Sequence, residues 1–243
     1  MIEKKIYDTY EKLSTRYNEL IDHKPHNAYY DRPNTLSLFP DKLEGMKVLD
    51  AACGPGKYAQ ELLRKGAKVT GFDQSPKMVQ LAKERNGEQG DFFVHNLTEP
   101  LTSIGNESHN VVLCALALEY VEDWTLTIQE FNRVLKSEGV LIISITHPFF
   151  DYTFFESKNY FDTEEVKCTW TGFGEPIEMH SYRRSLSECI TPLTSNGFQI
   201  DSILEPRPTE EMKQVAPRYY DELSKFPAFV CIRAQKRTMP IEH

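Results

Sequence analysis

The sequence of 243 residues contains no long apolar run, and this absence excludes integral membrane proteins with helical spans. No stretch approaches the ~20 consecutive apolar residues that a helix needs to cross a bilayer. The first six residues, MIEKKI, also lack the apolar centre of a signal peptide. We therefore expect a protein without a membrane span.

Cysteine is scarce, and its spacing does not suggest pairs. The five cysteines are odd in number and form no Cys-x-x-Cys motif. This usage favours reduced thiols over a disulfide framework, so we expect a cytoplasmic protein. The segment His23-Lys24-Pro25-His26 has a spacing that suggests a metal site, but Pro25 disfavours a helix there. We interpret it as a loop and expect no metal.

Positive charge is also in short supply. Lys and Arg number 28 against 36 Asp and Glu, which gives a formal net charge of −8. Because nucleic acids are bound largely through Lys and Arg, a broad nucleic-acid surface is not expected. The strongest local exception would be a patch of Lys4, Lys5, Lys57, Arg64 and Lys65.

The chain is rich in core-forming side chains, and they occur in segments that alternate between strand-like and helix-like patterns. Hydrophobic residues make up 40% of the sequence and aromatic residues 12%, enough for a single domain over residues 1–243. We expect strands at 47–50, 67–72, 91–95, 110–116, 140–145, 198–204 and 228–234. Helices are expected at 56–65, from Pro76 after the N-cap Ser75, at 123–136 closed by Gly139, and at 186–196 closed by Gly197. This alternation predicts an α/β fold with a doubly wound, seven-stranded, mostly parallel sheet of Rossmann-like type.

Two segments fall outside the alternation. Residues 2–22 carry apolar side chains at intervals of three and four, which predicts an amphipathic helix within an N-terminal helical cap over residues 1–45. Residues 147–184 hold ten aromatic side chains and show no helical period. We interpret them as an inserted substrate lid or hairpin after the fifth strand.

The most informative motif runs from Val48 to Gly56, VLDAACGPG. A short apolar strand ends in Asp50, turns through two glycines and enters a helix, whose unpaired N–H groups can bind an anionic group. A second strand ends in Asp73, 19 residues after Gly54, close to the spacing at which an acid reaches a ribose hydroxyl. The motif predicts a site for a nucleoside cofactor.

Two cofactors fit this motif. Gly54-x-Gly56-x-x-Ala59 satisfies the relaxed dinucleotide pattern, but Asp50 would lie close to a pyrophosphate and disfavour it. The same carboxylate suits the ammonium and sulfonium groups of S-adenosylmethionine (SAM). VLDAACGPG also resembles the first motif of class I SAM-dependent methyltransferases, D-x-x-C-G-x-G, with Ala52 in place of a common glycine. Within that class the chain resembles the type 11 and quinone C-methyltransferase-like enzymes.

The expected cofactor site collects residues from successive strand ends. Asp73 can bind the ribose hydroxyls, Met78 and Leu116 can enclose the adenine, and the Asn96 amide can serve its edge. The resemblance implies that Tyr17 covers the cofactor. Core packing is the alternative for Met78, Leu97 and Tyr17. The full set is Tyr17, Asp50, Ala52, Gly54, Gly56, Asp73, Gln74, Met78, Asn96, Leu97, Ala115 and Leu116.

Methyl transfer is an in-line displacement, so a base is needed only if the acceptor must lose a proton. The candidate bases are Glu119, Tyr120 and His147, with His180 as a further one. His147 follows the fifth strand directly, although a structural role in the turn with Pro148 is its alternative. The run Ala115–Val121 resembles the fourth family motif, with Glu119 where histidine is more usual.

The acidic, aromatic-rich segment 147–184 would suit a small planar or amine acceptor, for O-, N- or C-methylation. No Asn-Pro-Pro-Tyr or Asp-Pro-Pro-Tyr tetrad follows the fourth strand, which excludes the family devices for adenine or glutamine methylation. We expect a methyltransferase acting on a small molecule, present as a monomer or homodimer. A tRNA-modifying methyltransferase and a SAM-binding protein without turnover are the alternatives.

Overall fold

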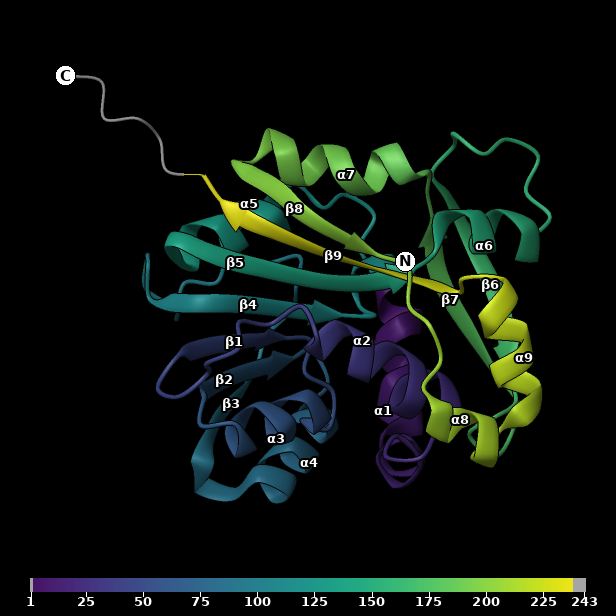
Figure 1. The fold of residues 1–243 in the computed structure, drawn as a ribbon, viewed down its shortest axis with the longest axis horizontal. Helices are drawn as coiled ribbons and strands as arrows, with labels where there is room; N and C mark the ends of the chain where they lie inside the picture. Colours follow the sequence, from purple (N-terminus) through teal and green to yellow (C-terminus); the bar gives the residue numbers. More distant parts are fainter. Residues whose placement is uncertain (1, 238–243) are drawn as a thin grey trace.

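A seven-stranded sheet organises the chain, as the computed structural model shows for residues 2–237 (Figure 1). The strand order is β3-β2-β1-β4-β5-β9-β8. Strands β1 to β5 are parallel, whereas β9 runs antiparallel to both β5 and β8. The predicted seven-stranded, mostly parallel sheet is confirmed. The strands are β1 (Lys47–Ala51), β2 (Lys68–Asp73), β3 (Gly90–Val94), β4 (His109–Ala115), β5 (Leu135–Thr146), β8 (Phe198–Leu204) and β9 (Phe229–Lys236).

Helices bury both faces of the sheet, which explains why its central strands are apolar throughout. One face packs against α3 (Lys57–Arg64) and α4 (Pro76–Asn86), and the other against α5 (Thr125–Val134) and α7 (Leu186–Ser195). Consecutive β1 residues enter different cores: Val48 packs with the α3 side and Leu49 with the α5 side. The predicted cap of α4 is present, since the Ser75 hydroxyl accepts a hydrogen bond from the Met78 amide at 3.1 Å.

The junction of α5 and β5 differs most from the prediction. The helix expected to reach Lys136 ends at Val134, and β5 begins at Leu135 without a loop. Leu135 pairs with His109 of β4, and the register then shifts before Val111 pairs with Val140. Gly139 therefore lies inside an irregular strand and closes no helix. Phe131, Val134 and Leu135 are spaced like residues on one face of a helix, so the sequence pattern does not show that the helix ends at Val134. Leu135 is buried as a residue of the sheet and not of the helix.

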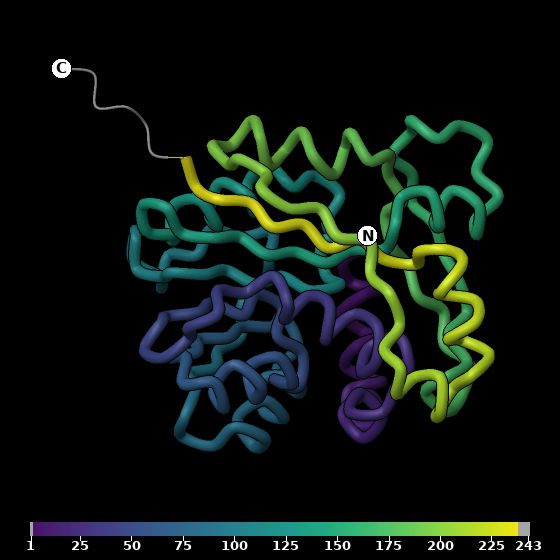
Figure 2. The backbone as a smooth tube through the Cα atoms, viewed as in Figure 1, coloured from purple at the N-terminus to yellow at the C-terminus, as the bar shows by residue number. Residues whose placement is uncertain are grey.

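The sheet reverses its direction of growth between β1 and β4. From β1 the chain adds β2 and then β3 on one side, and it then returns to place β4 on the other side of β1. Figure 2 shows the teal strands β4 and β5 standing between the blue strands of the first half and the green and yellow strands β8 and β9. Ligands of open α/β sheets bind at the carboxyl ends of the strands at such a reversal.

The remaining elements gather around those carboxyl ends. The N-terminal segment forms α1 (Ile2–Leu20), a π-helix η1 (Asn27–Asp31) and α2 (Arg32–Leu36). The segment after β5 holds α6 (Pro148–Phe154) and the hairpin of β6 (Glu164–Trp170) and β7 (Ile177–Arg183). Two short helices, α8 (Glu210–Val215) and α9 (Pro217–Lys225), pack near η1, where Met212 and Leu223 share a small core with Tyr30. Within residues 2–237, no helix combines the length and apolarity of a membrane span.

Candidate active site

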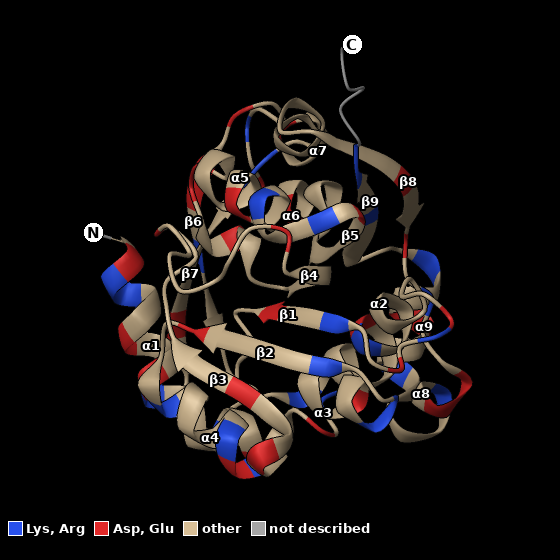
Figure 3. Cartoon of the chain, turned by 90° about the vertical axis from the view of Figure 1, so that its left-hand side faces the viewer, with Lys and Arg blue, Asp and Glu red and all other residues tan. Residues whose placement is uncertain are grey.

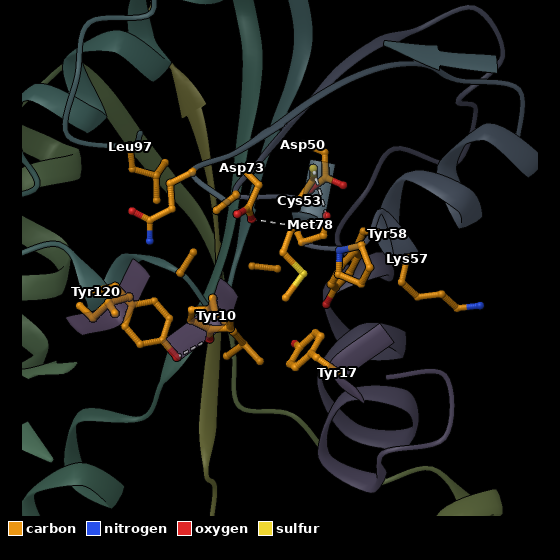
Figure 4. A pocket seen from close by; sticks show the side chains of 18 of the residues that line it. Tyr10, Tyr17, Asp50, Cys53, Lys57, Tyr58, Asp73, Met78, Leu97 and Tyr120 are labelled. Atoms are coloured by element: carbon orange, nitrogen blue, oxygen red, sulfur yellow. Dashed lines mark hydrogen bonds between the residues drawn. The ribbon is translucent and has the colours of Figure 1, made fainter. Parts of the chain in front are cut away.

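A cavity opens where β1, β2 and β4 end, and α1 forms its opposite wall (Figure 4). Its atom-free space, including the open side, is about 1100 Å³. Of the twelve residues predicted to bind the cofactor, all except Gly56 line this cavity.

The loop after β1 is held in shape by left-handed backbone and by Asp73. Ala52 has φ of 57° and Gly54 has φ of 51°, and nothing lies within 4 Å of a Cβ added at Gly54. The Gly54 amide donates to Asp73 Oδ2 at 2.9 Å, and the Ser75 amide donates to Oδ1 at 2.9 Å. Burial raises the pKa of Asp73 to about 6 in spite of these two hydrogen bonds. The glycine loop and Asp73, which the sequence places 19 residues apart, are thus joined directly by a hydrogen bond.

Asp50 ends β1 as a buried carboxyl group with spare bonding capacity. It is 1% exposed, and its Oδ2 has no hydrogen-bond partner among residues 2–237. Burial raises its pKa to about 7, although the amide of Ala59 acts to lower it. A buried acceptor without a partner costs free energy, which a cationic ligand in the cavity would recover.

Arg32 lies on the wall of the same cavity and was not predicted. The side chain is 7% exposed; its Nη2 donates to the Ile21 carbonyl at 2.9 Å, and its Nε has no partner in the described chain. Asp31, beside it, accepts hydrogen bonds from the Tyr58 and Thr35 hydroxyls. No regular spacing pointed to these residues, because they belong to the irregular turn from η1 into α2.

The charges of the wall favour SAM over a dinucleotide. Four carboxyl groups face the cavity, those of the buried Asp31 and Asp50, the half-buried Asp73 and the exposed Glu3, against two cations, Arg32 and Lys57. Lys57 already lies 3.2 Å from Asp22. A pyrophosphate would meet more negative than positive charge, whereas the methionine end of SAM offers an ammonium to Asp50 and a carboxylate to Arg32. The residues present therefore fit SAM.

Gly56 lies where α3 approaches α4 closely. It begins α3 with φ of 73°, and a Cβ there would lie 2.5 Å from Asn86 Nδ2 and 3.0 Å from Ala82 Cβ. Asn86 also donates to the Gly56 carbonyl at 3.1 Å. The glycine permits close packing of α3 against α4 and is not among the residues that line the cavity.

The three candidate bases are separated in space. Tyr120 lines the cavity and accepts a hydrogen bond from the Tyr10 hydroxyl at 2.8 Å. Glu119 lies behind it in a small second pocket with Asp151 and Arg184. Burial raises the Glu119 pKa to about 8, and its Oε2 has no partner in residues 2–237.

His147 and His180 both occupy structural positions. His147 caps α6: its Nδ1 accepts from the Phe149 amide at 3.2 Å, its Nε2 lies 3.2 Å from Glu205, and burial lowers its pKa. His180 bridges Glu165 and Glu178 on the hairpin at 2.9 and 2.8 Å. Neither imidazole is among the groups lining the cavity.

The segment expected to be a lid lies one layer behind the cavity. No residue of 147–184, all of which are described, is among the cavity-lining residues. The hairpin instead packs on α1: Phe173 stacks on Tyr17 with ring centroids 5.2 Å apart, and Thr9 donates to the Glu178 carbonyl at 3.3 Å. α1 covers the cavity directly, and the hairpin supports α1.

Comparisons with known proteins agree with this geometry. A family model described as a methyltransferase domain matches residues 49–143, from β1 into β5. A putative methyltransferase of Bacillus subtilis is 26% identical over 89% of this chain and 84% of its own length. A ubiquinone biosynthesis O-methyltransferase of Haemophilus ducreyi is 34% identical over 46% of this chain and half of its own. The crystal structure of a putative S-adenosylmethionine-dependent methyltransferase from Listeria monocytogenes is 27% identical, with a TM-score of 0.69 over 85% of this chain and 96% of that one.

Proposed function

Because the chain belongs to the class I SAM-dependent methyltransferases, we propose that it transfers the methyl group of SAM to a small molecule held between α1 and the strand ends. The observation that carries the placement of the cofactor is the pair of buried, unpartnered polar atoms on one cavity wall. One belongs to an acid, Asp50, and the other to a cation, Arg32. A zwitterionic amino-acid end complements both.

The proposed cofactor residues divide between the two ends of SAM. Asp50 and Arg32 hold the methionine end beside the start of α3. Asp73 accepts from the ribose hydroxyls, since each of its oxygens keeps a lone pair beyond its bond to the Gly54 or Ser75 amide. Met78, Asn96, Leu97 and Leu116 enclose the adenine.

When bound, SAM supplies a methyl group on positively charged sulfur, already activated for displacement. The protein then needs to orient the acceptor and exclude water. α1 supplies a wall of Ile6, Tyr10 and Tyr17 against which an acceptor can be held. Tyr120 offers the hydroxyl nearest to that space from the opposite element, η3 (Leu118–Tyr120).

A small acceptor is supported by the cavity and by the surface charge. The Haemophilus ducreyi relative is an O-methyltransferase of ubiquinone biosynthesis, although the match covers half of it. Two cations of the basic patch that tRNA binding would use are paired with acids: Arg64 lies 3.4 Å from Glu61, and Lys57 lies near both Asp22 and Glu61. Figure 3 shows Lys and Arg interleaved with Asp and Glu over α1 and α4.

Calorimetry tests the proposal first. Titration with SAM and with S-adenosylhomocysteine (SAH) should show binding to one site per chain, and nicotinamide dinucleotide should show none. Binding of the dinucleotide in place of SAM would overturn the cofactor placement. Release of SAH in the presence of small acceptors but not of tRNA then tests the acceptor class.

A further inference from the structure

Three tyrosines form the end of the cavity across from Asp50 and Asp73, and one of them, Tyr17, is also predicted to cover the cofactor. Tyr10 and Tyr17 project from α1 opposite Asp50 and Asp73, and Tyr120 lies beside Tyr10 (Figure 4). The Tyr10 ring is edge-on to Tyr120 at 5.6 Å and to Tyr17 at 6.2 Å between centroids. This tyrosine end is the place for the methyl acceptor.

The tyrosine end offers no base. Burial raises the pKa of Tyr10, Tyr17 and Tyr120 well above the ordinary value, so all three are neutral phenols. The one imidazole among the described lining residues is His95, at the end of β3, with its Nε2 3.2 Å from the Glu99 carbonyl. An acceptor that must lose a proton before attack, such as a phenol or thiol, has no partner here.

The hydroxyls of the tyrosine pair offer a ligand one acceptor and one donor. Tyr10 donates its hydroxyl proton to Tyr120, so toward a ligand it can only accept. Tyr120 keeps one proton and can donate it. A ligand that brings its own N–H donor is therefore complementary to Tyr10.

The charge around this end favours a cation. The charged side chains that line the cavity outside the proposed SAM contacts are Glu3 and Asp31, with Lys57 turned to Asp22. Aromatic faces attract cations in addition. Transfer to a neutral amine moves the positive charge from sulfur to nitrogen, where these groups stabilise it, but transfer to an anionic oxygen needs a negative charge to enter an acidic site.

We infer that the acceptor is a small primary or secondary amine, bound as the neutral base with its N–H on Tyr10 and its carbon frame against the tyrosine rings. The inference rests on the proposed methyltransferase function. The nitrogen lone pair forms the new bond to the methyl carbon while the carbon–sulfur bond breaks and its electron pair stays on sulfur. The product ammonium then loses its proton to water, which balances the reaction without a protein base.

A panel of matched acceptors tests the inference. Benzylamine, N-methylbenzylamine and a set of aliphatic amines are compared with phenol, benzenethiol and benzoate, with SAH formation as the readout. We expect turnover of amines, with kcat/KM rising with pH through the pKa of the amine used and following that pKa from one amine to the next. A protein that binds SAM but methylates none of the amines, or prefers phenol, thiol or carboxylate, overturns the inference. A protein that does not bind SAM overturns the proposed function itself.

Tyrosine variants give a second readout that needs no turnover. Tyr10→Phe removes the accepting oxygen but keeps the ring, so the affinity of the turned-over amine for the SAH-saturated protein should fall about tenfold. SAM affinity should stay unchanged. Tyr7→Phe, on the same helix but outside the cavity lining, is the matched control. Equal amine affinity in Tyr10→Phe and wild type would remove Tyr10 from the acceptor site.

Discussion

Buried carboxyl groups determine how single residues of this protein respond to substitution and pH. Burial raises the pKa of Asp50 to about 7, of Asp73 to about 6 and of Glu119 to about 8. In a protein without ligand, each of these groups is costly to ionise in place. In the proposed complex, Asp50 and Asp73 gain polar partners and Glu119 does not, so the three should behave differently.

Asp73→Ala should weaken SAM binding while leaving the fold in place. The lost hydrogen bonds to a charged acceptor are worth about 1.5–3 kcal/mol, measured by calorimetry against wild type. Part of the loss comes from the Gly54 and Ser75 amides, which lose the group that orders the loop. Asp91→Ala, an exposed acid on β3, is the control and should bind SAM normally. Wild-type affinity in a folded Asp73→Ala protein would remove Asp73 from the site.

Glu119→Gln should gain stability over wild type as the pH rises. The folded pKa of about 8 lies above the ordinary 4.5, so the contribution of Glu119 is fully present below pH 4.5 and is lost as the pH rises through 8. The amide keeps the shape and cannot ionise. The melting temperature of the variant relative to wild type should increase between pH 5 and pH 9, by about 10 °C. A difference that stays constant over this range would show that Glu119 does not titrate in the folded protein.

At the scale of elements, the two glycines after β1 separate binding from packing. Gly54 faces open space, whereas a Cβ at Gly56 would meet Asn86 and Ala82 of α4. Both glycines have a left-handed φ, so replacing either of them by alanine introduces a backbone strain of about 1–2 kcal/mol. The steric clash is added only at Gly56.

Gly56→Ala should therefore destabilise the protein more than Gly54→Ala, by a further ~1–3 kcal/mol from forced separation of α3 and α4. Gly54→Ala should instead lose more SAM affinity, because its Cβ projects from the loop that lines the cavity. Urea unfolding and calorimetry on the two variants measure both effects. Equal unfolding free energies would contradict the packing role of Gly56.

The elements that sequence alone predicted are those with a local signal. Ser75 and Pro76 mark the start of α4 by their own chemistry, and the structure begins the helix there. The end of α5 was missed because Leu135 fits both a helical period and a buried strand. α6 was missed because four of its seven residues, PFFDYTF, are aromatic, and these side chains mask any helical period.

The cavity shows the same division between local and long-range signals. Asp50, Gly54 and Asp73 lie at strand ends that the motif identifies. Arg32 reaches the cavity only because η1 and α2 fold back beside β1, and no spacing in the sequence encodes that approach. The position of the hairpin behind α1, and not over the cavity, likewise depends on contacts between segments more than 100 residues apart, such as Thr9 with Glu178.

At the scale of the whole molecule, access to the cavity depends on α1 and on what supports it. α1 lines the cavity with Tyr10 and Tyr17. The turn between β6 and β7 contacts the residues that follow α1 directly. Lys24 donates to the Gly172 carbonyl at 2.9 Å and lies 3.9 Å from the centroid of the Phe173 ring, which stacks on Tyr17. Opening α1 must break this contact or carry the hairpin with it.

Phe173→Ala should therefore speed the release of SAM. The variant removes the ring that supports Tyr17 from behind without touching the cavity lining, so we expect the dissociation rate to rise about threefold to tenfold with a smaller change in the association rate. Stopped-flow displacement of SAM by excess SAH measures it. Phe161→Ala, in the same insertion but 74% exposed, is the control and should release SAM at the wild-type rate. If Phe173→Ala released SAM no faster than this control, the hairpin would have no part in holding α1 closed, and the insertion would be a separate feature of the fold.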